Sequence, residues 1–225
     1  MKNQLFIGAI AITGLFTACN NAPAGEKAAV TDAQATDTTK TAAAAETGGF
    51  KVDAAASTVK WEGSKVGGKH TGDFKVKEGS LVVADGNITG GSFVIDMTTL
   101  NNTDLKGEEK TKLEGHLKSP DFFDVAKFGS AKFEITKVEK VEKPAAGKPT
   151  HTVTGNLTLK DVTKSVTMGA NLTADATSAK ADAPQFVINR TDWGVKYGSK
   201  TLAGAAKDKI INDEVGISIH LEARK

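Results

Sequence analysis

The chain has 225 residues, a length that suits one or two domains, and a formal net charge of +2. This balance does not support the basic surface of a nucleic-acid-binding protein, so no nucleic-acid partner is expected. Aromatic residues make up only 6% of the chain and glycine is frequent, which favours strands and turns over long helices.

Residues 1–18 are predicted to be a secretory signal peptide. Lys2 precedes an apolar run from Leu5 to Phe16, which is too short and wrongly flanked for a membrane-spanning helix. The ending "LFTAC" resembles a bacterial lipobox, with Phe16 where leucine is usual, and implies cleavage before Cys19 and diacylation of its thiol. The alternative is an ordinary signal peptide with a chance cysteine. Cys19 is the single cysteine of the chain, so it cannot form an internal disulfide.

Residues 19–49 are predicted to be the lipidated cysteine followed by a disordered tether. Large apolar side chains are almost absent from this stretch, which therefore cannot bury enough surface to offset its ordering entropy. One folded domain is expected over residues 50–225, which is long enough for a real core.

The folded domain is predicted to be all-β. Apolar and polar residues alternate along most of its length, and about eight antiparallel strands with one wet face are expected. The inward faces include Val59 and Trp61, Phe93, Ile95 and Met97, Phe133 and Ile135, Leu157 and Leu159, Val166 and Met168, Phe186 and Ile188, and Ile217 and Ile219. "ADGN" (84–87) and "LKDVTKSV" (159–166) contain short turns. Eight consecutive strands suit an up-and-down antiparallel barrel, wide enough for one small ligand.

One segment breaks this pattern. Residues 103–124 carry Leu113 and Leu117 at helical spacing among charged residues, with Thr103 or Asp104 as a start cap and Pro120 after the end. We expect one short amphipathic helix beside the barrel, followed by a single turn that carries Phe122 and Phe123.

The stretch "GSKVGGKHTGDF" (63–74) begins like a phosphate-binding loop, but His70 stands where that motif needs a hydroxyl. A phosphate loop must lead into a helix, whereas this stretch leads into another strand. Its glycines are therefore interpreted as a tight turn between two strands.

No catalytic or metal constellation emerges from the sequence, so neither an enzyme nor a cofactor is predicted. The four histidines (His70, His116, His151 and His220) lack metal-ligand spacing. Arg190 ends the apolar face of Phe186 and Ile188 and needs a partner. That partner is either an ion-pairing carboxylate, Asp192 or Asp213, or the anionic head group of a ligand at the barrel mouth.

Three stretches resemble the YceI-like family of bacterial lipid-binding proteins. They are "GHLKSPDFFDVAKFGSAKFEI" (115–135), "GNLTLKDVTKSV" (155–166) and "NRTDWGVKYGS…DKIINDEVGISIHLEA" (189–223). The resemblance covers the whole predicted domain. It departs from the family pattern at Asn189, where aspartate is usual, and in the loop "SKTLAGAAKDK".

The resemblance implies a lipocalin-like eight-stranded barrel that holds a polyisoprenoid or similar long-chain lipid. It also implies export to the periplasm. With a lipidated Cys19, we expect the protein to be anchored to a cell membrane, preferably the outer membrane. A homodimer is possible as well. The expected ligand-binding residues are Phe74, Phe93, Ile95, His116, Phe122, Phe123, Phe133, Ile188, Arg190 and Trp193. Two alternatives remain: an interaction module with a filled core, and a hydrolase at the barrel mouth that uses His116 and Arg190.

Overall fold

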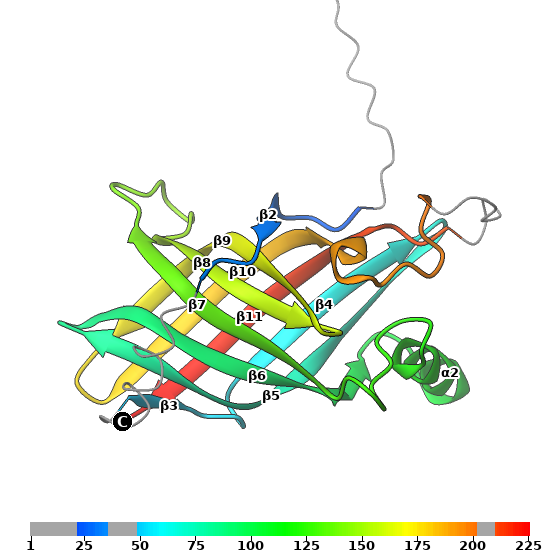
Figure 1. The fold of residues 1–225 in the computed structure, drawn as a ribbon, viewed down its shortest axis with the longest axis horizontal. Coiled ribbons are helices and arrows are strands. Elements are labelled where there is room, and N and C mark those ends of the chain that lie inside the picture. The colour runs from blue at the N-terminus through cyan, green and yellow to red at the C-terminus, as the bar shows by residue number, and fades with distance from the viewer. Residues whose placement is uncertain (1–21, 36–48, 202–209) are drawn as a thin grey trace, which may run out of the picture.

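The computed structural model describes residues 22–35, 49–201 and 210–225. The predicted signal peptide and Cys19 lie outside these ranges. Eight of the described strands close an antiparallel barrel (Figure 1), as expected from the alternation. They are β4 (Thr58–Lys65), β5 (Gly68–Ala84), β6 (Asn87–Asn102), β7 (Ser130–Lys140), β8 (His151–Leu159), β9 (Val162–Ala174), β10 (Ser178–Asn189) and β11 (Glu214–Arg224).

Each barrel strand pairs with the next along the chain, and β11 pairs with β4 to close the ring. A short strand, β3 (Phe50–Val52), lies between the far ends of β5 and β11, beyond the first residue of β4. The buried residues follow the predicted alternation, with Phe93, Ile95 and Met97 of β6 all in the core.

Two hairpins have the expected tight turns. Asp85 and Gly86 join β5 to β6, and Lys160 and Asp161 join β8 to β9, all four with positive φ. Two consecutive residues with positive φ match the right-handed twist of the strands that they join. The stretch at 63–74 forms the β4–β5 hairpin, with its turn at Val66 and Gly67, as predicted.

The predicted helix exists but is shorter than expected. Helix α2 spans Gly107–Lys118 and is followed by consecutive turns over residues 119–127. The prediction of a Thr103 or Asp104 cap was wrong, because Lys106 occupies the N-cap position without a side-chain hydrogen bond. Asp104 instead accepts hydrogen bonds from the backbone N–H of Thr71 (2.8 Å) and from the side chain of Asn102 (2.7 Å).

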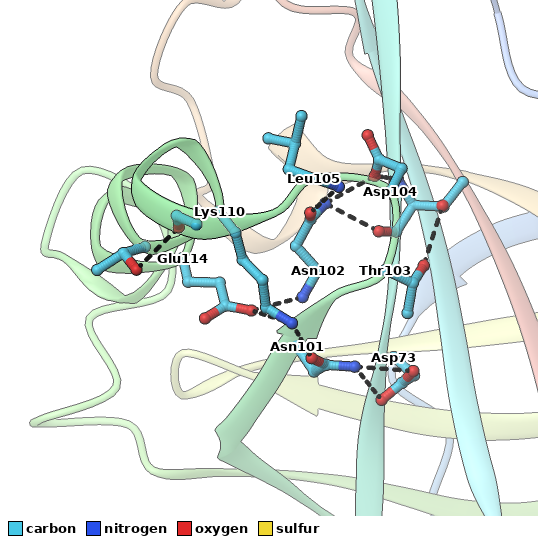
Figure 2. A network of polar contacts seen from close by, with 11 residues as sticks. Asp73, Asn101, Asn102, Thr103, Asp104, Leu105, Lys110 and Glu114 are labelled. Atoms are coloured by element: carbon cyan, nitrogen blue, oxygen red, sulfur yellow. Dashed lines mark hydrogen bonds and ion pairs between the residues drawn. The ribbon is translucent and has the colours of Figure 1, made fainter.

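A polar network fixes the base of α2 to the barrel (Figure 2). Asn102, which is fully buried, accepts a hydrogen bond from Leu105 N, and its own backbone N–H donates to Glu114 of the helix at 2.7 Å. Lys110 also lies 3.6 Å from Glu114 and donates to Asn101 on β6. These bonds position α2 at one end of the barrel, since the helix itself buries no residue completely.

Residues 22–35 differ from the expected tether. The segment 23–34, here called the strap, contains β1 (Glu26–Lys27) and β2 (Ala29–Asp32) and lies along β9 and β10 of the barrel (Figure 1). Strand β1 pairs in parallel with β10, and β2 pairs antiparallel with β9. The prediction of disorder was wrong here because strand addition draws on backbone hydrogen bonds and needs no large apolar side chains.

Candidate ligand cavity

An apolar cavity of about 170 Å³ lies inside the barrel. All eight barrel strands contribute to its wall, together with the 3-10 helix η1 (Arg190–Trp193), Leu117 of α2 and the turns that follow it. The wall is almost free of polar atoms because the inward positions of the alternating strands are occupied by aliphatic and aromatic residues. Such a cavity excludes water and accepts apolar ligands.

Nine of the ten residues predicted to bind ligand line this cavity, and all ten fall within the described ranges. The nine are Phe74, Phe93, Ile95, Phe122, Phe123, Phe133, Ile188, Arg190 and Trp193. His116 is the exception. Its ring lies behind Phe122 (ring centroids 5.0 Å apart), and its Nε2 pairs with Asp121 at 3.1 Å. His116 therefore supports the wall from outside.

The cavity is small for a long chain. A dry cavity of about 150 Å³ is enough to bind one benzene molecule, and this cavity of about 170 Å³ is only slightly larger. A long apolar ligand must therefore displace side chains as it enters. Met97 and Met168 line the cavity, and methionine adapts readily because its chain is unbranched and flexible.

Two glycines set the width of the lumen. The ring of Phe133 lies across Gly155 of the neighbouring strand, where a Cβ would come within 2.4 Å of Phe133 Cζ. The indole of Trp61 lies in the same way across Gly72, where a Cβ would come within 2.4 Å of Trp61 Cζ2. Because these glycines have no side chain, both rings lie close to the neighbouring strand and leave the lumen open.

An aromatic cluster covers the end of the cavity next to α2. Phe122 contacts His116 and Tyr197, with centroid separations of 5.0 and 5.2 Å, and is itself buried. Phe123 is partly buried and meets Phe74 edge-on at 6.0 Å. The predicted wall formed by this segment is thus present.

Arg190 forms a buried junction at the same end. Its guanidinium is 3.3 Å from the Asp213 carboxylate, one of the expected partners. It also donates to the carbonyls of Val195 (2.8 Å), Ile211 (3.2 Å) and Asn212 (3.0 Å). Burial lowers the pKa of Arg190 and the Asp213 charge opposes that shift, but a guanidinium remains charged under ordinary conditions. With its donors used in this way, Arg190 is a structural junction in the cavity wall.

The two tryptophans of the cavity wall differ. Trp193 is fully buried and donates its indole N–H to the Leu157 carbonyl at 3.0 Å. Trp61 Nε1 is buried without a hydrogen-bond partner. Sequence alternation already placed Trp61 on the inward face.

Val195 and Ile211 also line the cavity, but they come from irregular segments, where no periodic pattern could have indicated them.

The described residues assemble neither a metal centre nor the suggested hydrolytic pair. No group of three or more His, Cys, Asp and Glu side chains within them could hold a metal ion. His116 and Arg190 have separate partners, Asp121 and Asp213. Among the helices in the described part of the chain, none is long and apolar enough to span a membrane.

A closed antiparallel barrel around an apolar cavity places the protein in the lipocalin-like class of β-barrels. Residues 50–223 match the YceI-like domain, and the chain belongs to the YceI-like family. A UPF0312 protein from Enterobacter sp. strain 638 is 37% identical over 45% of this chain and 47% of its own length. Protein YceI of Salmonella newport strain SL254 is 36% identical over 63% of this chain. The matched region spans 62% of that relative, less than two thirds of its length.

Two solved structures share the fold. Burkholderia cenocepacia BcnA matches with a TM-score of 0.58 and 22% identity, over 76% of this chain and 99% of BcnA. A Saccharophagus degradans domain, described as a polyisoprenoid binding domain implicated in plant cell wall breakdown, also has a TM-score of 0.58. It is 19% identical and covers 78% of this chain and 98% of its own.

Proposed function

We propose that this protein is an exported, lipid-anchored binding protein that holds a long apolar ligand, a polyisoprenoid or a similar lipid, inside its barrel. The observation that carries the proposal is the apolar cavity, whose wall is built by all eight barrel strands. The polyisoprenoid-binding relative of the same fold supports the choice of ligand class.

The binding energy comes from burial of the chain. Each buried methylene contributes about 0.8 kcal/mol, so a dozen contribute on the order of 10 kcal/mol before ordering costs are subtracted. The wall has almost no polar groups that could fix a particular chain position. Selectivity along the tail is therefore low, and the length of the lumen limits which chains fit.

Native mass spectrometry of the full chain, followed by analysis of its organic extract, tests the proposal. We expect a co-purified lipid that is lost in Ala131→Phe, because Ala131 lines the cavity and a phenyl ring there fills it. Lys137→Met is the matched control, since Lys137 is exposed on the same strand and its ion pair with Glu139 is exposed as well. Absence of lipid from the parent, together with failure to take up added polyprenol, would favour the filled-core interaction module.

Anchoring is proposed through Cys19 and rests on the lipobox resemblance. The mature protein is expected to begin at residue 19 and to partition with membranes, with stable anchoring because more than one acyl chain is attached. Cys19→Ser should release the protein from membranes or leave it unprocessed. N-terminal sequencing and detergent phase partition measure both properties, and a mature N-terminus elsewhere would contradict the anchor.

A further inference from the structure

The barrel has a seam between β9 and β10. The two strands pair directly only from Asn171 to Ala174 and from Ala179 to Asp182. Strand β10 then bulges between Ala183 and Phe186, next to Pro184, which has no N–H to donate. Beyond the bulge each strand presents a backbone edge that its neighbour does not pair, a feature that invites strand addition.

The strap fills this seam. Residues 26–27 pair with Phe186 and Val187 of β10, and residues 29–32 pair with residues 164–167 of β9. Between them Ala28 is buried and its N–H donates to the Val187 carbonyl at 2.9 Å. The strap is therefore part of the barrel wall, although it precedes the family-matched region of residues 50–223.

The seam borders the ligand cavity. An outer groove of about 430 Å³ runs beside the strap and is lined by residues 26–29, by residues 167–169 of β9 and by the loop at Lys148 and Pro149. Met168 and Phe186 line both this groove and the inner cavity. Only these side chains of β9 and β10 are common to the two spaces, so their movement would join the groove to the cavity.

Besides its backbone pairing with β9 and β10, the strap is held by side-chain contacts that can separate without disturbing the barrel. The ion pairs Asp32–Lys164 (2.8 Å) and Glu26–Lys148 (2.9 Å) are exposed, and such pairs are weak and screened by salt. At the far end, Gln34 exchanges two backbone hydrogen bonds with the Asn156 side chain, at 3.0 and 2.7 Å. The barrel ring is closed independently of the strap by β9–β10 pairing at the other end of the seam.

We propose that the β9–β10 seam is a lateral entry site for the apolar chain of a lipid, and that the strap is its removable cover. This inference rests on the proposed function. A chain lies first in the outer groove, displaces Met168 and Phe186 as the strap lifts, and enters the cavity sideways. In the proposed mature protein, Cys19 precedes Ala22 by three residues, which span about 10 Å at most, so the anchor keeps this entry close to the bilayer.

A disulfide lock tests the entry route. Ala29 and Thr167 are direct partners in the β2–β9 pair, so Ala29→Cys with Thr167→Cys links the strap to the barrel. The full chain carries Cys19→Ser to remove the native thiol. Thr71→Cys with Thr103→Cys is the matched control, because these hydroxyls are 3.1 Å apart at the base of α2, away from the seam.

Uptake of parinaric acid, a fluorescent fatty acid, is followed in the oxidised and reduced forms of each variant. We expect the strap lock to slow uptake and release about tenfold, reversibly on reduction, with little change in the amount bound. The α2 lock should leave the rates unchanged. Slowing by the α2 lock alone, or equal rates in both forms of the strap lock, would overturn the lateral route. No binding in the reduced proteins would overturn the proposed function as well.

A second variant opens the cover without a crosslink. A Cβ at Gly25 would lie 2.5 Å from the Gln185 carbonyl oxygen, so Gly25→Ala lifts the strap from β10. Because Gly25 is exposed and outside the barrel ring, thermal unfolding should stay near that of the parent. We expect release of parinaric acid to accelerate about threefold or more. Unchanged release, with strap amides shown by hydrogen exchange to be less protected, would overturn the proposal.

Discussion

Replacing Arg190 with methionine distinguishes a structural junction from a head-group site. The substitution leaves the Asp213 carboxylate, which is 4% exposed, without its cation. It also removes the donors to three backbone carbonyls. Breaking a buried ion pair from one side costs about 3–5 kcal/mol, because an uncompensated charge remains. For a domain of this size we therefore expect the melting temperature to fall by roughly 6–20 °C.

Thermal unfolding followed by circular dichroism measures this loss, and native mass spectrometry measures the ligand retained per folded molecule. The double variant Arg190→Met with Asp213→Leu should recover part of the stability, because the stranded charge is gone. Lys180→Met removes one partner of an exposed ion pair with Glu222 and should have little effect. A melting temperature within about 2 °C of the parent, together with loss of ligand, would refute the structural role and restore Arg190 as a head-group contact.

Three further predictions concern the wall and α2. Phe122→Ala should lower the free energy of unfolding by about 3 kcal/mol, as for other buried phenylalanines. Phe123 is only partly buried and lines the cavity, so Phe123→Ala should reduce ligand retention more than stability. Thermal unfolding measures the stability of each variant, and native mass spectrometry measures the ligand that it retains. Gly155→Ala should push the Phe133 ring into the lumen, cost about 1–3 kcal/mol and lower the amount of lipid bound; unchanged binding would argue against the role of Gly155 in setting the lumen width. Although burial opposes the shift, hydrogen bonds lower the pKa of Asp104. The stability that this carboxylate contributes is therefore present above about pH 4 and lost as pH falls further. The protection of α2 amides against hydrogen exchange, corrected for the intrinsic pH dependence of exchange, should fall with acid in the parent and much less in Asp104→Asn.

The sequence determined the barrel and most of its lining. Period-2 alternation decides which side chains face inward once a strand pairs, because successive residues point to opposite faces. The sequence alone therefore predicted the inward positions of Phe93, Ile95 and Phe133, and also the turn at Asp85 and Gly86. The family motifs at 115–135 and 189–223 then indicated the cavity end at which Phe122, Phe123 and Trp193 lie.

Only the tertiary structure decided which partners the isolated polar groups have and whether the alanine-rich strap pairs with the barrel. Arg190 could have met a ligand or a carboxylate, and its choice of Asp213 depends on segments that sequence patterns do not bring together. Composition predicted disorder for the strap because local sequence cannot show that β9 and β10 leave backbone edges open. Between these two strands Ala28 fits because its side chain is small. The hydrogen bonds that pair the strap with β9 and β10 come from the backbone, which offers the same donor and acceptor in almost every residue, so the side-chain sequence does not reveal them.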